Sequence, residues 1–212
     1  MDLLELFHAD VYVCDAGYTI RDGRIFPLET CEWEPGDCPG YTSYNPFDYP
    51  TLFLEFASLK TSHTTNTSIN EDALLEFANR YGLLFNYYPL SPESPNRNTV
   101  KEWREHVAYM DFSVKLWEKG QISEALHTIY FNNVTLDAEL NSKTDDLELR
   151  CDSLLSALYL QNYFAIKGNK TFNKCAWCGA WFEILPPATR NTRKFCSNAC
   201  KQAEYRHRKG GK

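Results

Sequence analysis

The sequence lacks any run of about eighteen consecutive apolar residues, the length that a helix needs to span a bilayer. Residues 1–7, Met-Asp-Leu-Leu-Glu-Leu-Phe, also lack the basic start of a secretory signal peptide. We therefore expect no membrane segment and a cytoplasmic location. Thiols stay reduced in that compartment, so Cys14, Cys31, Cys38 and Cys151 need not form disulfides.

Known catalytic motifs are missing as well. The sequence contains no Walker loop, no G-x-S-x-G, no H-E-x-x-H and no G-x-G-x-x-G, and the His-x-Glu of zinc deaminases is absent. His8 stands near Asp10 and Asp15, but this spacing matches no hydrolase or nuclease pattern. We interpret the chain as a binding protein rather than an enzyme. An enzyme would need a pocket that gathers His8, His63 or His106 with carboxylates.

Length and charge divide the chain into two domains. At 212 residues, it is long enough for one sizeable core and a small appended module. From Lys167 onward, seven Lys and four Arg face only Glu183 and Glu204, a formal charge of +9 that leaves −15 for residues 1–166. We predict an acidic body over residues 1–168 and a basic domain over residues 169–212. Contact with nucleic acid is expected at the basic domain alone, because the body would repel phosphates.

Turn and capping signals indicate the fold class of the body. Residues 10–56 are rich in aromatic and β-branched side chains and contain turn dipeptides such as Asp22-Gly23, which predicts strands and a tight hairpin. Four helices are predicted after them: one that a capping box starts at residues 68–71 and Gly82 ends, one from Thr99 to Gly120, one from Ile122 to about Phe131, and one from Asp146 to Lys167. The prediction is an α+β body, with a β-rich N-terminal part followed by helices.

Four cysteines near the C-terminus form two close pairs, Cys175 with Cys178 and Cys196 with Cys200. Zinc prefers four tetrahedral ligands, and a two-residue gap lets two thiolates from one tight turn reach the same ion. Gly179 suits the left-handed backbone of such a turn, and the wider second pair is typical of one thiol before a helix and one in its first turn. The pattern predicts one structural zinc ion, because four thiolates leave no open coordination position.

The residues around these cysteines predict a treble clef, and they carry a resemblance. Residues 180–185 form an apolar stretch that predicts a strand, with residues 192–195 as its partner strand. The pattern Cys-x-x-Cys-Gly-x-Trp-Phe, then Lys-Phe-Cys-Ser-x-x-Cys and a trailing Tyr-Arg-x-Arg, resembles the C-terminal treble-clef fingers of bacterial regulator-like proteins, the CGNR zinc-finger group and its relatives. The resemblance covers about residues 172–208, although this chain has Cys200-Lys-Gln-Ala where that group has Cys-Gly-Asn-Arg. Because the group is taken to bind DNA, the resemblance implies a role in transcription regulation.

The cations of the basic domain are the candidate nucleic-acid contacts, since a short cationic helix can enter a major groove or lie along phosphates. They are Arg190, Arg193, Lys194, Lys201, Arg206 and Arg208. We expect DNA rather than RNA as the partner, and a protein or ligand on the acidic body. Two alternatives stay open: a protein-interaction scaffold with a purely structural zinc, and an enzyme with an active site in the body.

Overall fold

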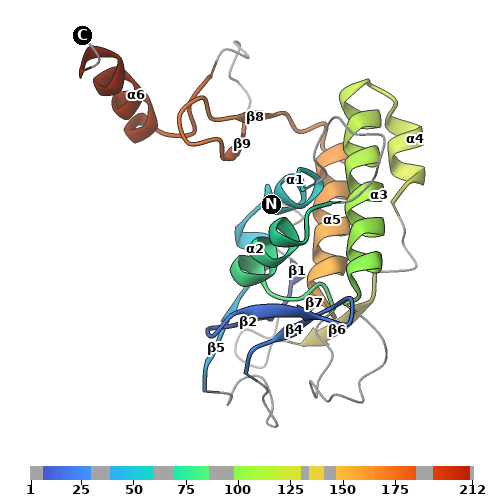
Figure 1. Cartoon of the computed structure of the whole chain (residues 1–212). Helices are drawn as coiled ribbons and strands as arrows, with labels where there is room; N and C mark the ends of the chain where they lie inside the picture. Colours follow the sequence, from blue (N-terminus) through green and yellow to red (C-terminus); the bar gives the residue numbers. More distant parts are fainter. Residues whose placement is uncertain are drawn as a thin grey trace. The chain divides into compact units, whose positions relative to one another are not determined.

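The computed structural model describes residues 7–29, 39–59, 69–85, 98–129, 134–140, 147–184 and 193–210, and short strands come first among them (Figure 1). The strands are β1 (Phe7–His8), β2 (Val11–Cys14), β3 (Tyr18–Arg21), β4 (Arg24–Pro27) and β5 (Tyr41–Tyr44). β3 and β4 form the hairpin that the sequence predicts, and Asp22 and Gly23 at its turn have φ of 50° and 70°. β2 pairs antiparallel with β5.

Helices follow these strands. They are the 3-10 helix η3 (Pro46–Asp48), α1 (Leu52–Ala57), α2 (Glu71–Tyr81), α3 (Val100–Glu118), α4 (Ile122–His127) and α5 (Leu154–Lys167). The capping box at Thr99 is confirmed, because the Thr99 and Glu102 side chains each accept the other's backbone N–H. The predicted start of α2 is wrong by two residues. Asn70 caps this helix instead, by accepting the N–H of Asp72 at 3.0 Å.

Two strands that the sequence analysis did not predict lie between α4 and α5. β6 (Leu136–Leu140) and β7 (Leu147–Cys151) pair antiparallel, and β7 also pairs in parallel with β1. The predicted helix from Asp146 is therefore wrong over residues 147–151. Leu147 and Cys151 fit a helical spacing, but Leu147, Leu149 and Cys151 also alternate as a strand requires, and pairing with β1 decides in favour of the strand. Mixed helices and small sheets confirm the α+β class.

Helix α5 is the central element of the body, as Figure 1 shows, and runs beside α3. The residues from Leu154 to Leu160 are all at most 5% exposed, so the helix is buried on every side. Its polar side chains find partners on neighbouring elements. Tyr159 Oη lies 3.0 Å from His106 Nδ1 of α3, and Gln161 Nε2 donates to the carbonyl oxygen of Pro46 at 2.8 Å.

The chain divides into two compact units, Met1–Phe164 and Ala165–Lys212. After the end of α5, the second unit contains the antiparallel strands β8 (Phe172–Lys174) and β9 (Trp181–Glu183), followed by α6 (Asn198–Gly210). The predicted partner of β9 is wrong, because β9 pairs with β8 and not with residues 193–195. The reason is that Cys175 and Cys178 lie in the turn between β8 and β9, which brings these two strands together.

None of the helices in the described part of the chain combines the length and the apolar character needed to cross a bilayer.

Candidate metal centre and basic surface

The four C-terminal cysteines lie together in the second unit and could hold a metal ion. Their sulfur atoms all lie within 4.8 Å of one another. Cys196 Sγ is 3.7 Å from Cys178 Sγ and 3.5 Å from Cys200 Sγ. A tetrahedral site with Zn–S bonds of about 2.3 Å has edges of about 3.8 Å, close to both separations. The donor set and its geometry therefore fit a zinc ion.

The first cysteine pair is shaped by the turn between β8 and β9. The N–H of Cys175 donates to the carbonyl oxygen of Ala180 at 2.8 Å, and the N–H of Gly179 donates to that of Cys175 at 2.9 Å. Gly179 has φ of 74°, so the left-handed conformation expected after Cys178 is confirmed. The turn thereby presents two thiols on one side of the hairpin.

The second pair depends on α6. Cys196 precedes this helix by two residues, and Cys200 lies in its first turn, as the spacing predicts. Ser197 fixes the start of the helix, because its hydroxyl accepts the N–H of Cys200 at 3.2 Å. The helix thus carries the last candidate ligand, and its capping serine holds that ligand in place.

Electrostatics distinguish the thiols. Burial raises the pKa of Cys175, but backbone N–H groups of Cys178, Cys196 and Trp177 point at its sulfur and outweigh burial, so the pKa falls to about 6. Burial, and then hydrogen bonding with the other three thiols, raises the pKa of Cys196 to about 12. Cys175 is therefore the more readily deprotonated of these two thiols. A bound cation would favour loss of the proton from Cys196.

A small apolar cluster lies under the sulfur atoms. Its buried members are Cys175, Phe182 and Ile184, against which Phe195, Cys196 and Cys200 pack. Such a cluster is too small to order a segment of this length alone, so bound metal would supply much of the stability.

Arg193 braces the loop that carries Cys196, a role that the sequence analysis did not predict. Its Nε donates to the carbonyl oxygen of Phe195 at 3.0 Å, and one terminal nitrogen donates to that of Cys196. Its guanidinium also lies over the ring of Phe182, 5.1 Å from the centroid. The two hydrogen bonds reach residues close in the sequence, whereas the contact with Phe182 joins two separate segments and leaves no local signature in the sequence. Arg193 is thus a structural residue as well as a candidate phosphate contact.

The candidate cations are distributed over the second unit. A cavity of about 380 Å³ is lined by Arg193, Lys194 and Lys201, together with Phe195, Ser197 and Asn198. Arg206 and Arg208 lie farther along α6, where Arg206 Nε donates to the carbonyl oxygen of Gln202 and Arg208 pairs with Glu204. Arg190 lies outside the described residues. The structure thus brings three of the six cations together at one cavity.

Aromatic side chains accompany these cations on the surface. Trp177 is 42% exposed and Tyr205 is 52% exposed. The Trp177 ring contacts that of His207 edge to face at 5.6 Å, and Lys209 Nζ lies 4.8 Å from the centre of the Tyr205 ring. Exposed aromatic rings beside cations are typical of surfaces that bind nucleic acid.

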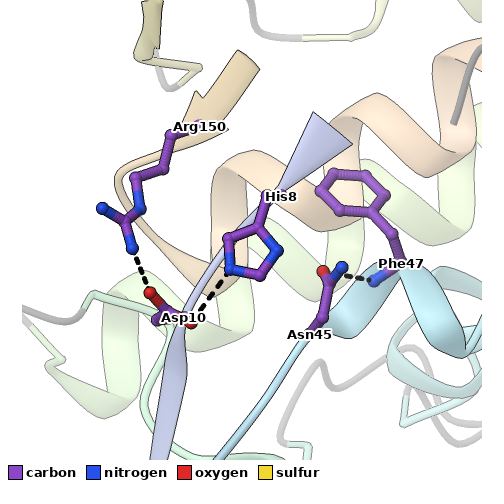
Figure 2. A network of polar contacts seen from close by, with 5 residues as sticks. All are labelled: His8, Asp10, Asn45, Phe47 and Arg150. Carbon is purple, nitrogen blue, oxygen red and sulfur yellow. Dashed lines mark hydrogen bonds and ion pairs between the residues drawn. The ribbon is translucent and has the colours of Figure 1, made fainter. Parts of the chain in front are cut away.

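In the body, Figure 2 shows the polar network that includes His8. His8 Nε2 lies 3.0 Å from Asp10 Oδ1, and Arg150 donates to the other oxygen of this carboxylate. His8 and Arg150 are register partners on β1 and β7, so the network ties the first strand to β7. Asp15 takes no part in it and accepts the hydroxyl of Thr42 at 3.2 Å. No local signal could have indicated Arg150, which lies far along the chain.

The remaining histidines and cysteines of the body have other surroundings. His106 contacts Tyr159, while His63, Cys31 and Cys38 lie outside the described residues. Cys14 and Cys151 are buried free thiols, and burial raises the pKa of Cys151 to about 12. The structure thus joins His8 to one carboxylate, and an active site in the body stays a prediction.

No model of a known protein family matches this chain, and no curated protein matches its sequence.

Proposed function

We propose that the second unit is a treble-clef zinc finger that binds nucleic acid, DNA rather than RNA, as part of a regulatory protein. One structural zinc ion would be held by Cys175, Cys178, Cys196 and Cys200. The uncompensated positive charge of this unit is the observation that carries the proposal.

The sulfur geometry supports zinc over an arrangement of free thiols. Four sulfurs lie within 4.8 Å of one another, and the two separations of 3.7 Å and 3.5 Å are close to a tetrahedral edge, so they form the donor set that zinc prefers. A closed thiolate site offers structural chemistry only. The ion would join the β8–β9 turn to α6 and so complete a unit with little apolar core. Reduced thiols of this kind suit a cytoplasmic protein.

The charge distribution supports a polyanionic partner. Both acidic residues from Lys167 onward are already paired, Glu183 with Lys170 at 3.3 Å and Glu204 with Arg208 at 2.8 Å. A zinc ion with four thiolates would change the formal +9 of this segment to +7. The unit stays strongly basic, and a phosphate backbone is a polyanion that it would attract.

Resemblance to the CGNR group supports DNA and regulation. In that reading, the basic finger contacts phosphates and the acidic body of Met1–Phe164 binds a protein or ligand that controls it. The strong negative charge of the body would keep its own surface away from phosphates, so binding and control would reside in different units.

Binding by the whole protein to random-sequence DNA and RNA at several salt concentrations tests the proposal. The test variant replaces Lys194, Lys201 and Arg206 by Ala. Each lost phosphate contact should remove about 0.9 from the slope of log affinity against log salt on duplex DNA. The variant should keep its zinc, because none of these residues is a ligand.

A matched variant controls for general loss of charge. It replaces three exposed cations of the body, Arg21, Lys101 and Lys119, by Ala. We expect its affinity and salt slope to stay near those of the wild type. Equal losses in both variants would point to diffuse attraction rather than a finger contact. If the wild type shifts no nucleic acid at low salt, the protein-interaction scaffold becomes the better account.

A further inference from the structure

The cavity beside the metal centre has a composition of its own. Its volume is about 380 Å³, within the range of about 300 to 1,000 Å³ that is usual for small-ligand sites. The described lining combines three cations, an aromatic ring, a hydroxyl and an amide: Arg193, Lys194, Lys201, Phe195, Ser197 and Asn198. No carboxylate belongs to this lining. An anion is therefore the ligand that its charge favours.

Two of these cations are unengaged among the described residues. The ammonium groups of Lys194 and Lys201 have no hydrogen-bond or ion-pair partner there, and the only acids from Lys167 onward, Glu183 and Glu204, pair with other cations. Arg193 is held in place by the carbonyl oxygens of Phe195 and Cys196. Since a guanidinium has five N–H donors, some remain for a ligand. A fixed arginine loses little rotamer freedom on binding, which favours affinity.

The uncharged residues of the lining indicate a ligand larger than inorganic phosphate. Ser197 and Asn198 offer hydrogen bonds, and Phe195, which packs on the apolar cluster, offers a half-buried ring. A nucleotide has a part for each of these groups: a phosphate for the cations, a polar base edge for the hydrogen bonds and a flat aromatic face for the ring. The cavity is also concave, whereas a duplex presents its phosphates on a convex surface with the bases stacked inside. A nucleotide can enter such a cavity only where it is unstacked.

A path for the rest of a strand leads away from the cavity along α6. Tyr205 follows Lys201 by four residues and Arg208 follows by three more, so the three side chains lie on one side of the helix. Tyr205 is 52% exposed and can stack on a base. Lys201 belongs both to the cavity lining and to this side of α6, so it links the cavity to the aromatic and cationic side chains of the helix.

We infer that the cavity lined by Arg193, Lys194 and Lys201 binds one unstacked nucleotide of a single-stranded nucleic acid, with its phosphate on the cations and its base near Phe195. This inference rests on the proposed nucleic-acid binding and narrows it to single strands. A duplex would contact the cations through its phosphates alone, with no base near Phe195, and would bind more weakly.

Fluorescence anisotropy on the full-length zinc-loaded protein tests the inference with two labelled probes, (dT)12 and a 12-base-pair duplex. We expect (dT)12 to bind about ten-fold more tightly, since a stacked base contributes about 1–3 kcal/mol. The pocket variant carries Lys194→Gln and Lys201→Gln. The matched control carries Arg206→Gln and Lys209→Gln, the same charge change on α6 outside the cavity lining. The pocket variant should lose the preference for (dT)12, and the control should weaken both probes alike.

The outcomes separate this inference from the proposed function. Equal affinity for both probes, with equal losses in the two variants, would overturn the cavity site while nucleic-acid binding stands. Failure to bind either probe at low salt would overturn both the cavity site and the proposed function.

Competition with unlabelled dTMP distinguishes a free nucleotide from a strand as the ligand of the cavity. If unlabelled dTMP and unlabelled (dT)12 displace the probe equally well at the same concentration of nucleotide, a free nucleotide is the ligand and the single-strand inference is wrong. Zinc content close to wild type in both variants shows that they fold.

Discussion

The guanidinium of Arg193 lies over the ring of Phe182, with its central carbon 5.1 Å from the ring centroid. Phe182 belongs to the apolar cluster beneath the cysteine sulfurs, and Arg193 also donates to the carbonyl oxygen of Cys196. One side chain thus connects β9, the loop that carries Cys196 and the cavity. Arg193, a candidate phosphate contact in the sequence, also holds this loop against the apolar cluster.

Replacing Arg193 by Ala should therefore destabilise the finger, whereas replacing its neighbour Lys194 should not. Arg193→Ala removes two hydrogen bonds and a stacked guanidinium, which together contribute about 1–3 kcal/mol. Lys194→Ala removes an exposed side chain and should cost about 0.5 kcal/mol or less. Chelator competition for the bound metal measures the difference. Equal zinc retention in the two variants would show that Arg193 is not a brace.

Gly82 should be far less replaceable than Gly120, although both have left-handed backbones. They end α2 and α3 with φ of 81° and 75°. A Cβ on Gly82 would lie 2.5 Å from the carbonyl oxygen of Tyr12, whereas one on Gly120 meets no described atom within 4 Å. Both Ala variants incur the left-handed penalty of about 1–2 kcal/mol. Gly82→Ala should cost roughly 1–3 kcal/mol more because of overpacking, as urea unfolding would measure. Similar losses for both would contradict the close approach of β2.

Removal of metal should affect the two units differently. Without an ion, the cluster around Phe182 is too small to keep the second unit folded, while the body retains its own core around α5. Limited proteolysis after chelation should cleave the region after Gly168 and leave the body intact. Digestion that proceeds at the same rate in both units, or an undigested finger, would disagree with this expectation.

Local signals explain what the sequence predicted. The hairpin at Asp22-Gly23, the capping box at Thr99 and the left-handed Gly179 each depend on neighbours within a few residues, and all three are confirmed. The clustering of the cysteine sulfurs also follows from short spacing within two local elements, a turn and a helix start.

Distant pairings explain what the sequence did not predict. Residues 147–151 fit both a helix and a strand, and only their pairing with β1 and β6 distinguishes the two. Residues 192–195 are predicted to pair with β9, but the hairpin closes around the first cysteine pair and β9 pairs with β8. The contacts of Arg150 with Asp10 and of Arg193 with Phe182 join residues that no periodicity relates.

Elemental analysis of the purified protein, set beside its Cys178→Ser variant, tests the central claim most directly. Four thiolates around one ion predict about one zinc per wild-type chain and loss of that zinc in the variant. The body provides the control, since Cys151→Ala alters a buried free thiol and should leave the zinc content unchanged. Wild-type protein without zinc, or zinc that is retained in Cys178→Ser, would contradict the assignment of these cysteines as its ligands.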